Sequence, residues 1–244
     1  MSKMNPGSQT AMGEAVGHEP FALSCRGIVK GYQGPGGRLD VLKGVDLEVR
    51  RGTILAILGV SGAGKSTLLN ILGTLDRADQ GSLAIRGERI DGLGEEALAR
   101  FRARRIGFVF QFHHLLPEFT AEENVMMPLL IAGSDPTQAR RKAREALGAV
   151  GLSERWEHRP SELSGGEAQR VAVARALVPE PELVLADEPS GNLDPAAARQ
   201  LQDLLASLAR EKHQTFVIVT HNDRLASLAD RVLTLESGLL VAAS

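Results

Sequence analysis

Short apolar runs punctuate the chain and are nearly continuous rather than alternating in polarity. They are Ile54–Leu58, Ile106–Phe110, Leu183–Ala186 and Phe216–Val219. Such runs are typical of strands that are buried on both faces within a parallel sheet. Glycine or polar residues follow these runs, namely Gly59, Gln111, Asp187 and, after Thr220, His221. Because ligands of open α/β sheets bind outside the carboxyl ends of the strands, these ends predict one shared site.

Helical patterns lie between the predicted strands. One apolar stripe follows a glycine-rich loop and consists of Leu68, Leu69, Ile71, Leu72 and Leu75. A second helix, charged on one side and apolar on the other, is predicted over Gln138–Val150 and closes at Gly151. Residues 112–178 are mostly helical and interrupt the strands, so we predict an inserted helical subdomain there. Short strand-like pieces in residues 21–49 and 82–90 predict a small antiparallel sheet beside the core.

The length of 244 residues allows one large α/β domain, or one core with a smaller inserted subdomain. The formal net charge of −2 gives no electrostatic footprint for nucleic acid, so we expect no nucleic-acid partner. Two basic runs, Arg100–Arg105 and Arg140–Arg144, are read as solvated helix faces. Contact with a partner or with anionic lipid head groups is the alternative for both runs.

A single cysteine, Cys25, excludes an intramolecular disulfide and suits a reducing compartment. Its apolar neighbours favour a packed thiol over a reactive one. Residues 1–20 have no apolar core of a signal peptide and are expected to form a flexible tail. The longest apolar stretches, Thr53–Val60 and Val125–Ile131, are shorter than the roughly 18 residues that a bilayer span needs. Any membrane role is therefore expected to be peripheral.

A glycine-rich segment, Gly59–Ser66, fits the phosphate-loop pattern G-x-x-x-x-G-K-[ST] and lies between a buried strand and a helix. Its backbone N–H groups and the helix N-terminus suit phosphate oxygens. Lys65 is expected to reach the β- and γ-phosphates, and the Ser66 hydroxyl to bind Mg²⁺. The full set of predicted contacts is Gly59, Val60, Ser61, Gly62, Ala63, Gly64, Lys65, Ser66 and Thr67. The loop predicts a P-loop NTPase core but does not separate a kinase, GTPase, helicase or transporter.

Two acids end the third apolar run. We expect Asp187 to hold Mg²⁺ and Glu188 to polarise the attacking water. Gln111 is a candidate neutral ligand of Mg²⁺ and water, and His221 a candidate contact of the γ-phosphate. Taken singly, the assignment of Gln111 or His221 to the site is weak. The prediction depends on their common location at the ends of predicted strands. The other histidines show no metal-ligand spacing, so we predict no zinc.

The only tyrosine, Tyr32, lies in a glycine-flanked stretch before the core. Stacking of its ring on adenine is one interpretation. A core or surface tyrosine without a ligand is the other.

A second helix start follows Leu163, where Ser164, Gly165, Gly166 and Glu167 precede a helix predicted from about Ala168 to Leu177. This run resembles the signature motif of ABC ATPases. An aromatic A-loop residue (Tyr32), the phosphate loop, the Q-loop Gln111, the acid pair, a D-loop (Asn192-Leu193-Asp194) and the switch residue His221 accompany it in the family's order. The resemblance covers about residues 21–242.

The resemblance implies a RecA-like P-loop core with a mainly parallel sheet, and an ATPase that uses MgATP. It also implies that two copies, or paired ATPase subunits, join head to tail. Each ATP would then lie between the phosphate loop of one subunit and Ser164, Gly165, Gly166 and Asp194 of the other. The resemblance further implies catalytic roles for Glu188, His221 and Gln111. It implies that Ser66, Gln111 and Asp187 bind the metal ion. Integral membrane permease subunits would be the further partners.

The amino-acid sequence around the Q-loop and just before the signature resembles that of the ATPases of lipoprotein-releasing (Lol) systems. The resembling segments are 111–120, 123–125, 128–130 and 158–162. This implies a peripheral subunit on the cytoplasmic face of the inner membrane, touching the membrane only through its partner. A related macrolide, peptide or cell-division ATPase is the alternative, and a non-transport ABC protein a further one.

The apolar residues after Gln111, including Leu115 and Leu116, belong to core packing or to partner docking. Three positions depart from the family's usual residues, namely Ser190, Asn222 and Ala168. None of the three removes a catalytic role.

Overall fold

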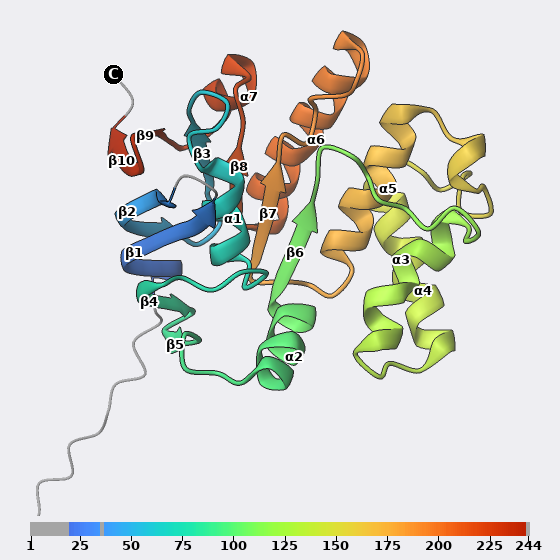
Figure 1. Ribbon diagram of the computed structural model, residues 1–244. Coiled ribbons are helices and arrows are strands. Elements are labelled where there is room, and N and C mark those ends of the chain that lie inside the picture. The colour runs from blue at the N-terminus through green and yellow to red at the C-terminus, as the bar shows by residue number, and fades with distance from the viewer. Residues whose placement is uncertain (1–19, 35–36, 243–244) are drawn as a thin grey trace, which may run out of the picture.

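Two sheets organise the chain in the computed structural model, which describes residues 20–34 and 37–242 (Figure 1). The larger sheet has the order β10-β9-β3-β8-β7-β6. Its strands are β3 (Ile54–Leu58), β6 (Ile106–Val109), β7 (Leu183–Asp187), β8 (Phe216–Val219), β9 (Arg231–Glu236) and β10 (Leu239–Ala242). All neighbours are parallel except β10, which is antiparallel to β9. The predicted mainly parallel sheet is confirmed, and β6 ends one residue before the predicted Phe110.

Both faces of this sheet are covered. Along β7, Leu183 and Leu185 pack with α1 (Lys65–Leu72) and the smaller sheet, whereas Val184 and Ala186 pack with the helices on the other face. Each of these four side chains is fully buried. Because successive residues point to opposite faces, burial on both sides demands an unbroken apolar run, which is the pattern seen in the sequence.

The strand register brings the carboxyl ends of the central strands level. Asp187 of β7 is paired with Val219 of β8, and Val219 with Ile57 of β3. Val109 of β6 is level with Ala186 of β7. The residues that follow these strands therefore share one edge of the sheet.

A smaller antiparallel sheet packs beside the core with the order β2-β1-β4-β5. Its strands are β1 (Phe21–Gly34), β2 (Gly37–Arg50), β4 (Gln80–Ile85) and β5 (Glu88–Arg89). Cys25 of β1 is buried, as expected, and burial raises the pKa of its thiol to about 12. This thiol is therefore protonated and unreactive at neutral pH.

Helices connect the strands. They are α1 (Lys65–Leu72), α2 (Glu95–Arg105), α3 (Ala121–Ile131), α4 (Pro136–Ala149), α5 (Gly165–Leu177), α6 (Pro195–Lys212) and α7 (Asp223–Ser227), with a 3₁₀ turn at Pro160–Glu162. Figure 1 shows α3, α4 and α5 gathered beyond β6 at one side of the molecule. They occupy the segment 112–178, whose status as a separate subdomain stays a prediction. None of the helices that the structure describes is long and apolar enough to cross a bilayer.

The boundaries of three helices differ from those predicted. Helix α4 covers Pro136–Ala149 rather than Gln138–Val150, because Asp135 accepts the N–H groups of Thr137 and Gln138 and caps the helix. Helix α5 begins at Gly165 rather than near Ala168, because the Ser164 hydroxyl accepts the N–H of Glu167 and caps the helix. Helix α1 ends at Leu72 against the cap residue Gly73, so Leu75 of the predicted stripe lies outside it and is exposed.

Candidate nucleotide-binding site

The phosphate loop joins β3 to α1 and is shaped by glycines. Gly62 and Gly64 have φ angles of 81° and 99°, in the left-handed region that favours glycine. A Cβ atom on Gly64 would also lie 2.6 Å from Val41 Cγ1. Within the described part of the chain, no side chain caps the N-terminus of α1. Its backbone N–H groups and helix dipole are therefore available for an anion.

Lys65 closes this loop on itself. Its Nζ donates to the carbonyl oxygens of Gly59 and Val60 at 2.7 and 3.1 Å. The ammonium thus lies at the end of β3, and its charge opposes the rise that burial causes in the pKa of Asp187 at the end of β7. The predicted loop residues lie together, and only Ala63 is absent from the wall of the cleft described next.

A cleft of about 900 Å³ opens between the phosphate loop and the ends of β6, β7 and β8. Its wall contains most of the predicted residues, which are Tyr32, Gly59, Val60, Ser61, Gly62, Gly64, Lys65, Ser66, Thr67, Gln111, Asp187, Glu188 and His221. Val41, Phe110, Phe112 and His114 complete it and were not predicted. Phe112 and His114 come one and three residues after Gln111, so the Q-loop was a signal for them. Val41 comes from β2 and has no local signal.

Glu188 lies at the centre of a group of polar contacts. Its Oε2 accepts the Thr220 hydroxyl at 2.9 Å and the His221 N–H at 3.3 Å. Its Oε1 lies 2.7 Å from Nδ1 of His221. The side chain of Glu188 is 13% exposed, and its φ of 44° is unusual for a residue other than glycine. Three contacts and a strained backbone hold one carboxylate toward the cleft.

Asp187 and Ser66 lie in contact. Burial raises the pKa of Asp187, a hydrogen bond from Ser66 opposes that rise, and the charge of Glu188 adds to it. A nearby cation would stabilise this carboxylate, since opposite charge favours the ionised form. Gln111 Nε2 donates to Asn192 Oδ1 at 2.9 Å, and Asn192 Nδ2 donates to the Gln111 carbonyl at 3.3 Å. This pairing leaves Oε1 of Gln111 as a potential ligand.

The oxygen donors of Ser66, Asp187 and Gln111 suit Mg²⁺, a hard cation that takes oxygen ligands. The observed Ser66–Asp187 contact brings two of the three donors together. The residues present therefore fit the metal.

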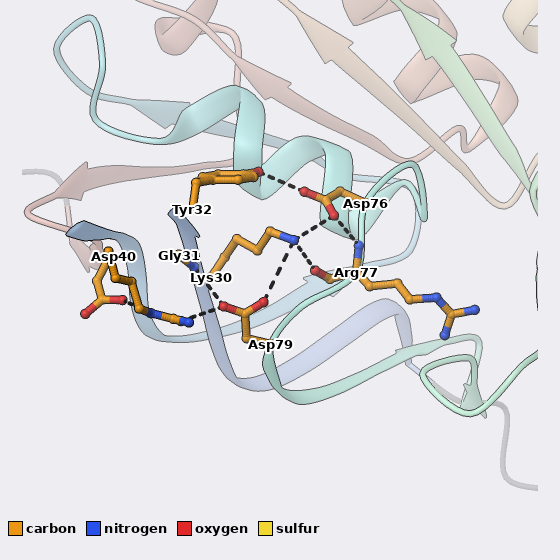
Figure 2. A network of polar contacts seen from close by, with 8 residues as sticks. Lys30, Gly31, Tyr32, Asp40, Asp76, Arg77 and Asp79 are labelled. Carbon is orange, nitrogen blue, oxygen red and sulfur yellow. Dashed lines mark hydrogen bonds and ion pairs between the residues drawn. The ribbon is translucent and has the colours of Figure 1, made fainter. Parts of the chain in front are cut away.

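Tyr32 lies at the rim of the cleft and is 42% exposed. Its hydroxyl donates to Asp76 Oδ2 at 2.8 Å (Figure 2). Burial and the Asp76 carboxylate raise the pKa of this phenol, so it remains a hydrogen-bond donor at neutral pH. The tyrosine is thus a surface residue with an anchored hydroxyl and a ring that borders the cleft.

The signature residues Ser164, Gly165 and Gly166 lie apart from the described wall of the cleft. Ser164 caps α5, and both its N–H and its hydroxyl donate to the Glu167 carboxylate. The Arg155 guanidinium lies 3.0 Å from the same carboxylate. These contacts lower the pKa of Glu167 to about 2. A Cβ on Gly166 would lie 2.9 Å from Ala197 Cβ, so glycine permits α5 to approach α6.

Asp194 also lies outside the cleft wall. It caps α6 by accepting the N–H groups of Ala196 and Ala197 at 2.9 and 3.0 Å. These bonds lower the pKa of Asp194. The signature and Asp194 therefore neighbour each other through the α5–α6 contact, on a surface distinct from the cleft of the same chain.

Comparison with known protein families and solved structures identifies proteins that are similar to this chain. A family model described as ABC transporter matches residues 42–191. The lipoprotein-releasing system ATP-binding protein LolD of Geobacter metallireducens is 56% identical over 220 residues, covering 90% of this chain and 98% of the relative. A protein of the same name from Porphyromonas gingivalis is 56% identical over 218 residues, with 89% and 98% covered.

Solved structures agree in fold. A dimeric post-hydrolysis state of the ATP-binding cassette MJ0796, bound to ADP and Pi, matches with a TM-score of 0.82 at 36% identity. The match covers 89% of this chain and 96% of that one. A second dimeric structure of MJ0796, a bacterial ABC transporter cassette, matches with the same TM-score at 37% identity.

Proposed function

The chain belongs to the ABC transporter family as one of its ATPases, and from that premise we propose that it powers a lipoprotein-releasing system. The observation that carries the catalytic part is the meeting of Lys65, Asp187 and Glu188 in one cleft. The relatives named for lipoprotein release support the choice of system, since they are matched over 98% of their length.

Binding of ATP would use the phosphate loop. The N-terminus of α1 and Lys65 would bind the phosphates, and the ring of Tyr32 at the rim would stack on the base. Lys65 would exchange its bonds to the Gly59 and Val60 carbonyls for stronger bonds to phosphate oxygens, in which the acceptor is charged as well as the donor.

Hydrolysis would use Glu188 as the base for the attacking water. Thr220 and the backbone of His221 hold one carboxylate oxygen, so the second is oriented toward the cleft. His221 contacts that second oxygen and is itself 73% exposed in its side chain, which lets it turn to a γ-phosphate. Positioning of the water and removal of its proton are the chemical work of these residues.

Ser66, Asp187 and Gln111 would hold Mg²⁺. When bound, this ion neutralises charge on the β- and γ-phosphates. The Gln111–Asn192 pair orients the Gln111 amide, so the metal ligand and the D-loop are linked.

A second copy would complete the site. Ser164, Gly165, Gly166 and Asp194 lie outside the cleft of their own chain, yet Ser164 and the glycines begin a helix suited to phosphate. Head-to-tail pairing would place them over the cleft of the partner. The dimeric state of the structurally similar cassette supports this arrangement.

Integral membrane permease subunits would be the other partners, at the cytoplasmic face of the inner membrane. Leu115 packs in the core, whereas Leu116 and Phe112 are exposed, at 39% and 66%. These exposed apolar side chains support docking of a partner near the Q-loop, with membrane contact only through that partner and no nucleic-acid contact.

Purification of the tagged chain from detergent-solubilised membranes tests this function. We expect a permease whose complex hydrolyses ATP and releases lipoproteins from membranes, and we expect both activities to fail with Lys65→Ala. Recovery with a macrolide or cell-division permease, or with ribosomes, would overturn the proposal.

A further inference from the structure

A polar network joins the end of β1 to the segment that follows α1, at the rim of the cleft (Figure 2). Asp76 is its centre. Oδ2 accepts the Tyr32 hydroxyl at 2.8 Å, and Oδ1 accepts Lys30 Nζ and the Arg77 N–H, each at 2.7 Å. Lys30 is only 9% exposed and also donates to the Arg77 carbonyl at 2.7 Å. A buried ammonium therefore holds the carboxylate that holds the phenol.

Asp79 makes a second attachment between the same two segments. Its Oδ2 accepts the N–H of Gly31 at 2.9 Å and lies 2.6 Å from a guanidinium nitrogen of Arg38. Residues 76–79 follow α1, and α1 begins at Lys65 in the phosphate loop. The phosphate loop and the support of Tyr32 are thus fixed at opposite ends of one short helix.

The ring of Tyr32 has a third restraint. Lys30 Nζ lies 5.1 Å from the ring centroid, and Figure 2 shows the lysine on one side of the ring. A cation at this distance attracts the ring face. Lys30 is not part of the described cleft wall, whereas Tyr32 is. The lysine therefore supports the ring without occupying the place of a ligand.

We propose that Asp76, anchored by Lys30, is a positioning residue that holds the Tyr32 ring at a set place relative to the phosphate loop. The proposal rests on the stacking of Tyr32 on adenine proposed above. A 42% exposed aromatic side chain would otherwise be ordered only when the base binds. Holding it beforehand corresponds to a roughly two- to ten-fold gain in affinity.

Calorimetric titration of the full chain with MgADP tests this, with Mg-pyrophosphate as the ligand without a base. Tyr32→Phe and Asp76→Ala should each raise the MgADP Kd by about two- to ten-fold. The double variant should bind no more weakly than Asp76→Ala alone, because the Tyr32–Asp76 bond is already lost in that single variant. Pyrophosphate binding should stay unchanged in all three.

Asp91→Ala is the matched control. Its side chain is 31% exposed, as is that of Asp76, and it pairs with Arg89 beside the same sheet without contacting Tyr32. We expect MgADP binding as in the unaltered chain. Tyr32→Ala should weaken MgADP by about 5- to 150-fold through loss of stacking.

The outcomes separate the two proposals. Normal MgADP binding by Tyr32→Phe, with weak binding by Tyr32→Ala, would overturn the positioning role and leave stacking in place. Normal binding by Tyr32→Ala would overturn stacking itself. Equal weakening of pyrophosphate and MgADP by Tyr32→Phe would mean that the network supports the phosphate loop as a whole, which also overturns the positioning role.

Discussion

Replacement of Glu188 by glutamine removes the proposed base with little change of shape. The amide oxygen can still accept the Thr220 hydroxyl and the His221 N–H, which now lie 2.9 and 3.3 Å from Oε2. The amide nitrogen takes the place of Oε1, 2.7 Å from His221 Nδ1, and can donate to it. We therefore expect a folded chain that lacks only the proton acceptor.

The expected loss follows from the value of a positioned base. Such a group contributes about 10²- to 10⁴-fold to a rate, which corresponds to a barrier higher by about 2.7–5.4 kcal/mol. MgATP binding should be retained, because Lys65 and the α1 N-terminus are untouched. The charge of Glu188 also raises the pKa of Asp187, so its removal favours the ionised form of that proposed metal ligand.

Steady-state phosphate release by the complex with its membrane partner measures turnover, and gel filtration with MgATP measures dimer formation. Glu182→Gln is the matched control, since Glu182 directly precedes β7 and pairs with Arg86 and Arg105 away from the cleft. It should turn over normally, whereas Glu188→Gln should accumulate as an ATP-bound dimer. Turnover of Glu188→Gln within about tenfold of the unaltered chain would contradict the assignment of the base.

Four further changes test other parts of the site. Lys65→Ala should weaken MgADP by about 10- to 150-fold in calorimetry, the value of a hydrogen bond to a charged group, whereas Lys142→Ala, which breaks a surface pair, should not. Gly64→Ala should lower the thermal midpoint, since φ is 99° and the new Cβ meets Val41, whereas Gly92→Ala has open space and should be neutral. Ser164→Ala should cost about 1 kcal/mol of stability by loss of the cap, seen as a midpoint about 2–4 °C lower. Glu167→Gln should destabilise the chain at neutral pH, because the pKa of Glu167 is lower in the folded chain, at about 2, than the ordinary value of 4.5. In acid denaturation the difference in stability between the variant and the unaltered chain should vanish as the pH falls from 4.5 to about 2. A difference that does not depend on pH would contradict this.

The sequence predicted those parts of the site that depend on local pattern. Burial on both faces required unbroken apolar strands, and the phosphate loop has a spacing set by covalent geometry. The start of α5 was placed too late because Gly165 and Gly166 are poor helix formers. The Ser164 and Glu167 pair, three residues apart, was a capping-box signal that marks the true start.

Long-range contacts had no such signal. Asp76 lies 44 residues from Tyr32, and Asn192 lies 81 from Gln111, so only folding brings each pair together. Strand β9 was missed because its buried and partly exposed residues alternate instead of forming a continuous run. Asn192 was predicted as a D-loop residue, but its pairing with Gln111, like that of Asp76 with Tyr32, was not identified before the fold was known.

The hydroxyl of Ser164 has one proton, and in the free chain that proton is already donated to Glu167 at 2.8 Å. A phosphate oxygen only accepts, so it would have to compete with the carboxylate for this proton while being repelled by its charge. The signature turn by itself should therefore be a poor receptor for free nucleotide. It would engage only phosphates that are already held in place by another chain, which makes capture and closure two separate events in time.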